Sequence, residues 1–224
     1  MNDNIIWDPT RLILQTVNYP RRRQELIHMP CLRFEDMAVT CRLLLRQDEA
    51  SWVSVQVTDD MVRGKMGEEE LFRTAGANSR RLLPPVVEDI RDVLKEYAAD
   101  ESLENDPENV ENALRSAGAR PEKADGFEEG LMYVVTNPKR IFGASTLFYS
   151  DVLHKLAEEL DGDLLILPSS IHEVLALPYM GNEYDAAFRD MVRHANQTVV
   201  LEKEILSDSI YRYHRKQQRL SLID

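Results

Sequence analysis

Apolar and polar residues alternate along two neighbouring stretches near the beginning of the chain. Residues 37–46 (MAVTCRLLLR) place an apolar side chain at every second position, and residues 52–57 (WVSVQV) do the same with valine. Strict alternation places the apolar side chains on one face of a β-strand. Because a short polar connection, residues 47–51, separates the two stretches, we expect a β-hairpin. The shorter run 12–17 (LILQTV) predicts a strand that precedes it.

Helical patterns follow these strands in the first half of the chain. Asn18 followed by Pro20 is typical of a helix start, with the asparagine as cap and the proline in the first turn. Three glutamates at 68–70 favour the first turn of another helix, where the helix dipole stabilises negative charge. After Pro84-Pro85, apolar residues recur at helical intervals over residues 86–97 and predict an amphipathic helix.

The second half repeats the mixture of strands and helices. Ser150 is expected to cap one helix, and Asn182 to begin another that closes at Asn196. A single helical turn is expected at residues 202–206, and a polar tail after the last strand. The strands predicted in this half cover residues 132–136, 141–149, 164–167, 171–177 and 210–213.

Strands therefore come in adjacent pairs, with helices between the pairs. This order predicts an α+β fold, with largely antiparallel sheets built from hairpins and packed amphipathic helices. Residues 100–130 hold ten acidic and three basic side chains, which accounts for −7 of the net charge of −12. We expect this segment to be an acidic, mobile connector. It would separate an α+β half at 1–99 from a second at 131–224, unless the two form one composite domain.

Composition excludes several classes of protein. A net charge of −12 disfavours nonspecific binding to nucleic acid or to an anionic membrane. No apolar run approaches the ~20 residues that span a bilayer, and the N-terminus lacks a signal-peptide pattern, so a cytoplasmic location is expected. The two cysteines, Cys31 and Cys41, lack metal-binding spacing. Their pairing stays open, and no metal or cofactor is predicted.

Four stretches together resemble a known family. They are residues 17–39 (VNYPRRRQELIHMPCLRFEDMAV), 67–85 (GEEELFRTAGANSRRLLPP), 132–178 (MYVVTNPKRIFGASTLFYSDVLHKLAEELDGDLLILPSSIHEVLALP) and 204–215 (EILSDSIYRYHR). The family is bacterial, is classed only as a domain of unknown function, and is common in gut Gram-positive bacteria. The resemblance spans nearly the whole chain and implies an intracellular bacterial protein associated with mobile elements. It implies no activity and transfers no catalytic residue.

The stretch LPSSIHEVLALP, residues 167–178, contains the only candidates for chemistry: Ser169, Ser170, His172 and Glu173. A nucleophile needs a base beside it, and the base needs a carboxylate to orient it. On a strand, His172 and Glu173 would point to opposite faces, whereas Ser170 would share a face with His172. The preferred interpretation is a turn between two core strands. The alternative is a polar cleft near Ser170 and His172 in a small hydrolase-like enzyme.

A second candidate lies at the end of the chain. Residues 211–219 (YRYHRKQQR) alternate aromatic with basic side chains, a pattern that can stack on single-stranded nucleic acid. The acidic net charge argues against nucleic acid, so the preferred interpretation is a solvated strand end and tail, salt-bridged to the acidic segment. A protein partner is the other use considered for this segment. The residues proposed for contact with that partner are Tyr211, Arg212, Tyr213, Arg215 and Lys216.

These observations favour a non-enzymatic protein-interaction or regulatory module over an enzyme, because no motif reaches catalytic specificity. Its partner would be an unidentified protein. The small hydrolase is the first alternative, and a nucleic-acid-associated protein acting through residues 211–219 is the second. Paired strands with exposed edges would also allow a homodimer.

Overall fold

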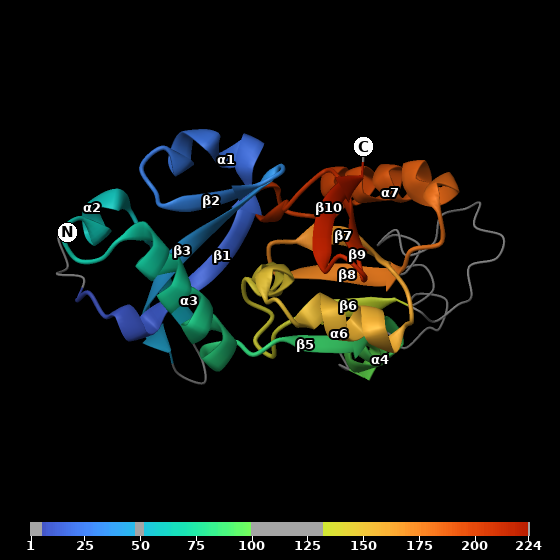
Figure 1. Cartoon of the computed structure of the whole chain (residues 1–224), viewed down its shortest axis with the longest axis horizontal. Coiled ribbons are helices and arrows are strands. Elements are labelled where there is room, and N and C mark those ends of the chain that lie inside the picture. The colour runs from blue at the N-terminus through green and yellow to red at the C-terminus, as the bar shows by residue number, and fades with distance from the viewer. Residues whose placement is uncertain (1–5, 48–51, 100–131, 224) are drawn as a thin grey trace.

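Two lobes lie side by side along the longest axis of the molecule (Figure 1). The structure, a computed structural model, describes residues 6–47, 52–99 and 132–223. The predicted acidic connector therefore lies outside the described residues. Each lobe contains one antiparallel sheet, which we call sheet A in the first lobe and sheet B in the second.

Sheet A is organised around one long strand. β3 pairs with β1 along one edge, and along its other edge with β2 and then β4, so the predicted β3–β4 hairpin is confirmed. The Asn18 side chain accepts a hydrogen bond from the backbone N–H of Arg21, which confirms it as the cap of α1. The elements of this lobe are the 3-10 helix η1 (Pro9–Arg11), β1 (Leu12–Asn18), α1 (Tyr19–Leu26), β2 (Cys31–Phe34), β3 (Met37–Gln47), β4 (Trp52–Gln56), α2 (Asp59–Val62) and α3 (Glu68–Leu82).

Sheet B has the strand order β10-β9-β7-β8-β6-β5, and all its neighbouring strands are antiparallel. The predicted α+β class is thus confirmed. Where we expected a polar tail, β10 forms the edge of the sheet. The elements are β5 (Val86–Asp89), α4 (Ile90–Ala99), β6 (Tyr133–Thr136), η2 (Gly143–Phe148), α6 (Val152–Glu159), β7 (Leu164–Ser170), β8 (Glu173–Pro178), η3 (Asn182–Tyr184), α7 (Asp185–Thr198), η4 (Glu202–Glu204), β9 (Ile210–His214) and β10 (Arg219–Ile223).

The helix expected over residues 86–97 begins only at Ile90. Its first four residues form β5, which pairs with β6 so that Val86 lies opposite Thr136 and Val87 opposite Val135. The segment forms a strand despite its helical spacing, because pairing with the open edge of β6 satisfies its backbone hydrogen-bonding groups and suits its two valines. As a result, β5 and α4 belong to the second lobe although they precede residue 100.

The strand expected at 141–149 is also wrong. β6 already pairs with β5 on one edge and with β8 on the other, so a returning strand has no edge to join. The chain instead turns sharply, with Arg140 and Phe142 at φ values of 49° and 54° in the left-handed region. It then continues as the 3-10 helix η2.

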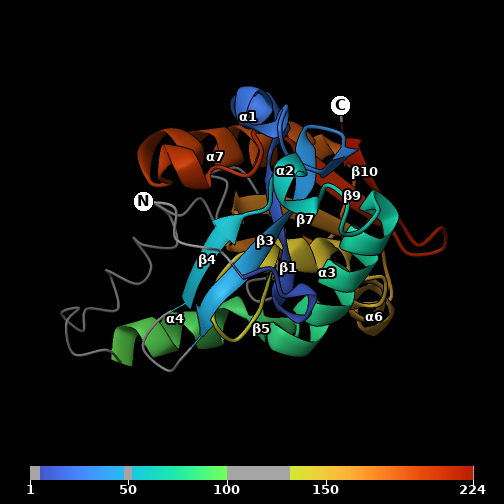
Figure 2. The same cartoon turned by 90° about the vertical axis from the view of Figure 1, so that its left-hand side faces the viewer.

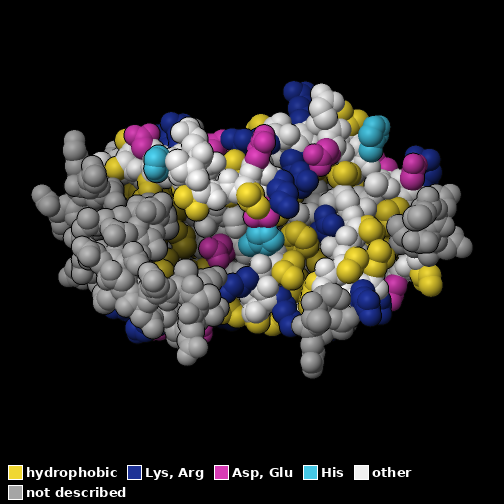
Figure 3. Space-filling model, turned by 180° about the vertical axis from the view of Figure 1, so that it is seen from behind, with side chains coloured by type: hydrophobic (Ala, Val, Ile, Leu, Met, Phe, Trp, Pro, Cys, Tyr) yellow, Lys and Arg dark blue, Asp and Glu magenta, His cyan; other side chains and the backbone are white. Residues whose placement is uncertain are grey.

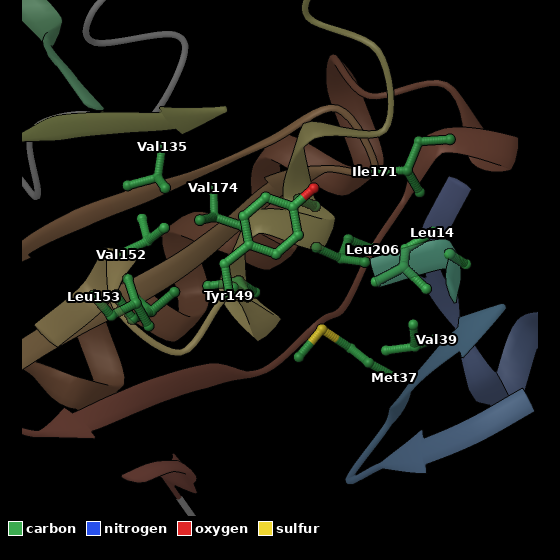
Figure 4. Close-up of a cluster of buried hydrophobic side chains, with 14 of the residues drawn as sticks. Leu14, Met37, Val39, Val135, Tyr149, Val152, Leu153, Ile171, Val174 and Leu206 are labelled. Atoms are coloured by element: carbon green, nitrogen blue, oxygen red, sulfur yellow. The ribbon is translucent and has the colours of Figure 1, made fainter. Parts of the chain in front are cut away.

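The inner face of sheet A, which we define as the face that carries Leu14, Met37 and Cys41, packs into one core with the second lobe. Figure 4 shows Leu14, Met37 and Val39 on one side of this core, with Tyr149, Ile171 and Leu206 facing them. α3 lies along the same side of the sheet (Figure 2), and its apolar residues join the cluster. Burial raises the pKa of Tyr149 to about 12, so its hydroxyl stays protonated. One hydrophobic core therefore serves both lobes.

Polar contacts reinforce this junction. The hydroxyls of Ser207 and Ser209 donate to one carboxylate oxygen of Asp36, at 2.7 and 3.1 Å, and the Tyr211 hydroxyl donates to the other. Burial, and then the Asp36 charge, raise the pKa of the Tyr211 hydroxyl. Since Asp36 lies in the β2–β3 turn, these bonds fix the tip of sheet A to the segment that leads into β9.

The outer face of sheet A carries the alternate residues of the same strands. The predicted alternation fails once, because the register shifts between Leu44 and Arg46 opposite β4. Leu44 is buried, whereas Leu45, which we expected to share a face with Val39, is 36% exposed. A β-bulge of this kind places one extra residue in the strand and changes which side chain points inward.

Candidate functional site

The turn between β7 and β8 meets a second loop at the junction of the lobes. β7 continues through Ser170 and β8 begins at Glu173, so the turn itself consists of Ile171 and His172. A turn is present, as expected, but it lies after the serines; the strand is irregular between Pro168 and Ser170. Figure 3, which shows the molecule from behind relative to Figure 1, has basic, acidic and histidine side chains near the middle of the view.

The polar side chains of the turn bind one another and the backbone. Ser170 Oγ accepts the backbone N–H of His172 at 3.0 Å, and Ser169 Oγ donates to Glu173 Oε1 at 3.4 Å. The other oxygen of Glu173 lies 3.7 Å from the Arg140 guanidinium. Among the described residues, neither serine hydroxyl contacts the imidazole of His172. The geometry thus supplies no nucleophile next to a base.

His172 is held by the loop that precedes η2. Its Nδ1 accepts the backbone N–H of Phe142 at 3.3 Å, and the two rings stack with centroids 6.0 Å apart. A neutral imidazole that accepts at Nδ1 carries its proton on Nε2. That nitrogen lies 4.0 Å from Glu204 Oε1, so the ring links the loop to η4.

Gly143 lets the loop and the turn approach closely. The Thr136 hydroxyl donates to the carbonyl of His172 at 2.7 Å, directly beside this glycine. A Cβ at position 143 would lie 2.2 Å from Thr136 Oγ1 and 2.3 Å from the His172 carbonyl oxygen. These distances are far inside van der Waals contact, so a side chain here would force the loop away from the turn.

Polar residues also occupy the middle of the outer face of sheet A. Arg42 donates from Nε to Ser54 Oγ at 2.8 Å and from Nη2 to the Ser54 carbonyl at 2.9 Å. Its Nη1 donates to the side-chain oxygens of Gln15 and Gln56, at 3.2 and 3.3 Å. Thr40 completes this group, which we call the polar floor. It consists of Gln15, Thr40, Arg42, Ser54 and Gln56.

The sequence interpretation missed the polar floor. A signal was available, because Gln15 interrupts the apolar run LILQTV and Arg42 interrupts MAVTCRLLLR. The alternation predicted Arg42 on the strand face opposite the apolar residues, and Gln15 was predicted only as part of a strand. In the structure Gln15 is only 2% exposed, and Arg42 is half-buried. In this chain, a polar residue inside an apolar strand therefore indicated the position of the polar floor.

Arg42 is a half-buried cation without a carboxylate partner among the described residues. Burial, and then the nearby Arg22, lower the pKa of Arg42, but a guanidinium keeps its charge at neutral pH. The guanidinium carbon lies 5.1 Å from the centre of the Phe142 ring. Since Phe142 also stacks on His172, a column of three side chains joins the polar floor to the β7–β8 turn.

The C-terminal candidates do not form one surface. Tyr211 and Tyr213 are buried in β9, at 0% and 5% exposure. Arg212 forms an ion pair with Asp163 at 2.6 Å, and Arg215 donates to the Glu158 carboxylate at 2.6 Å. The exposed residue of the group is Lys216 in the β9–β10 turn. The alternation of aromatic and basic residues reflects the two faces of a strand.

The cysteines are both free. Cys31 lies opposite Thr40 in the β2–β3 register, so the neighbouring Cys41 points to the other face of the sheet. Burial raises the pKa of the Cys41 thiol to about 12. In the parts of the chain that the structure describes, no group of three or more His, Cys, Asp or Glu side chains could hold a metal ion. Within the same ranges, no helix has the length and apolar character needed to cross a bilayer.

Comparison with known proteins places the chain in a family. A family model with the description "Family of unknown function (DUF5688)" matches residues 9–215, nearly the whole chain. This confirms the near full-length resemblance to a family of unknown function. No curated protein and no solved structure matches the chain significantly.

Proposed function

Because this chain belongs to DUF5688, a family of unknown function, its role has to be argued from its surfaces, and we propose that it is a non-enzymatic protein-binding module. Its binding surface would be the outer face of sheet A with the adjoining His172 turn. The supporting observation is that Arg42, Trp52 and Phe142 gather there, each half-buried. Tryptophan and arginine are the residue types that most often dominate the energetics of protein interfaces.

The polar floor lies between two apolar clusters on this face. At one end, Trp52 and Phe142 pack against the buried cluster of Ile13, Leu44 and Leu83. At the other end, α1 covers the cluster of Val17, Leu26 and Ala38. A polar centre flanked by apolar groups gives a partner both hydrophobic contact area and specific hydrogen bonds.

The alternatives lack comparable support. A hydrolase would need the Ser170 hydroxyl beside the His172 ring, yet that hydroxyl accepts a backbone N–H. A nucleic-acid-binding protein would need exposed aromatic rings in its C-terminal segment, and both Tyr211 and Tyr213 are buried. The bacterial and cytoplasmic setting implied by the sequence resemblance, and a homodimer, stay predictions.

Site-specific photo-crosslinking tests the proposal. A photoreactive amino acid replaces Gln56 in the polar floor, and the matched control carries it at the exposed Arg73 on α3. In a lysate of the native host, we expect a discrete adduct from position 56 that excess unmodified chain suppresses, and none from position 73. Equal labelling from both positions, or no adduct from position 56, would contradict the proposal.

A further inference from the structure

We propose that Arg42 is the receptor for a carboxylate group on an acidic segment of the partner protein. This inference rests on the protein-binding function proposed above and names the chemistry of its partner. It concerns a site on the outer face of sheet A, in the polar floor between α1 and the Phe142 loop.

The hydrogen bonds of Arg42 leave room for such a group. A guanidinium has five N–H donors. Ser54, Gln15 and Gln56 accept four of them, and every one of these acceptors is neutral. The second N–H of Nη2 has no acceptor among the described residues. The protein thus positions the guanidinium without neutralising it.

Other arginines show that this chain readily supplies carboxylates. Arg80 pairs with Asp151 at 2.6 Å, Arg212 with Asp163 at 2.6 Å, and Arg21 with Asp208 at 3.1 Å. The chain has 39 acidic and 27 basic residues, so acidic partners are plentiful. A half-buried cation that lacks one carries an uncompensated desolvation cost, and an incoming carboxylate would relieve it.

The surroundings favour a carboxylate monoanion. The side-chain amide nitrogen of Gln15 has no acceptor within the described ranges, and the oxygen of the same amide already contacts Arg42 Nη1. Because Gln15 is only 2% exposed, its amide positions the guanidinium, and the free N–H of Arg42 Nη2 is the donor that an incoming carboxylate would meet. Arg22 adds positive potential, and the Phe142 ring lies against the guanidinium, with its centre 5.1 Å from the guanidinium carbon. A phosphate group presents three acceptor oxygens, more than the free donor of Arg42 can satisfy, whereas a carboxylate presents two.

A peptide-binding titration of the whole chain tests this assignment. The probes are acetyl-tetraglutamate amide, acetyl-tetraglutamine amide and a capped phosphoserine peptide, measured by calorimetry at low ionic strength. We expect the glutamate peptide to bind at least about tenfold more tightly than the glutamine peptide, the effect of one hydrogen bond to a charged group. Arg42→Gln should remove this preference, and the charge-matched control Arg73→Gln should keep it. Tighter binding of the phosphoserine peptide would overturn the carboxylate assignment.

Gln15→Glu keeps the test independent of damage to the fold. The new carboxylate would lie where the amide oxygen now sits, 3.2 Å from Arg42 Nη1, and would occupy the receptor from within the chain. We expect a higher melting temperature and at least about tenfold weaker binding of the glutamate peptide. A lower melting temperature with unchanged peptide affinity would show that the site does not accept a carboxylate.

The two proposals fail in different ways. If the peptide preference does not depend on Arg42 while the crosslink from position 56 persists, the carboxylate receptor is wrong and the binding surface stands. If that crosslink is missing too, the protein-binding function itself is wrong.

Discussion

The two faces of sheet A are built from neighbouring residues of the same strands, yet they are put to different uses. The inner face carries Leu14, Met37 and Cys41, all buried in the core shared with the second lobe. The outer face carries Gln15 and Arg42, which hydrogen-bond to each other, and Arg42 also donates to Ser54 of β4. Moving one position along the chain therefore changes a side chain from core to polar floor.

This contrast shows where stability and recognition are separated. Apolar burial on the inner face joins the lobes, so substitutions there should unfold the protein. On the outer face, hydrogen bonds hold the guanidinium of Arg42 in place, and those bonds contribute little to the net free energy of unfolding. Substitutions there should alter binding more than folding.

The largest effect should come from the inner face. Met37 is fully buried between the lobes, so Met37→Ala would leave a cavity that neither lobe can fill. We expect a loss of about 2–5 kcal/mol in the free energy of unfolding. Urea denaturation followed by circular dichroism measures it. A loss below about 1 kcal/mol would mean that the inner face is not the main contact between the lobes.

A smaller loss is expected from Gly143→Ala, because the new Cβ would collide with Thr136 Oγ1 and the His172 carbonyl. Overpacking of this kind costs about 1–3 kcal/mol. The matched control is Gly76→Ala in α3, where the Cβ would only touch a Leu14 methyl at 3.8 Å and should favour the helix. Thermal melting compares the two. Equal melting temperatures would show that the loop can retreat without cost.

The outer face should tolerate substitution better. Ser54→Ala removes the hydroxyl that accepts Arg42 Nε at 2.8 Å but leaves the backbone carbonyl that binds Nη2. We expect a loss of about 1 kcal/mol in the free energy of unfolding. Denaturant titration alongside Met37→Ala gives the comparison directly. If Ser54→Ala cost as much as the core substitution, the two faces would not differ in the way described.

The smallest effect should depend on pH. Hydrogen bonds from Lys155 and then Arg80 lower the pKa of Asp151 from 3.8 to about 2. A carboxyl whose pKa is lower in the folded state stabilises the fold above its unfolded pKa, and this contribution disappears as pH falls toward the folded value. The side chain is 35% exposed, so solvent screening limits the contribution to about 0.5 kcal/mol.

Asp151→Asn should therefore lower stability slightly at neutral pH, and the difference from wild type should vanish as the pH drops from about 4 to about 2. Melting temperatures recorded across that range measure it. A difference that is constant with pH would show that the Arg80–Asp151 contact between the lobes is not electrostatic.

Much of the fold could be predicted because its strands and helices follow local patterns. Asn18 with Pro20 marked the start of α1, and alternation marked β3 and β4. The errors occurred where pairing decided the outcome. The spacing of Val86 to Asp89 predicts a helix, but in the structure this segment pairs with an edge of β6. The pattern of residues 141–149 predicts a strand, but both edges of β6 are already occupied. Neither condition is visible in a local window of sequence.

The candidate site was harder to predict. A turn between two core strands was predicted correctly, but it was placed at the serines with His172 on the next strand, whereas the turn consists of Ile171 and His172. The partners of His172, Phe142 and Glu204, come from distant parts of the chain. Arg42 was predicted only to lie on the strand face opposite the apolar residues, because alternation cannot show what lies above a sheet. A positive φ at Phe142, a residue that rarely adopts one, has no sequence signature either.

The contacts of Asp36 bear on how the chain is made. Ser207, which binds its carboxylate, follows it by 171 positions, and Leu206 beside it belongs to the core on the inner face of sheet A. During synthesis, all four strands of sheet A leave the ribosome long before these covering residues exist. The apolar inner face of sheet A therefore stays uncovered until the C-terminal segment has been synthesised. We expect nascent chains to depend on chaperones, and folding to be slow for a protein of this length.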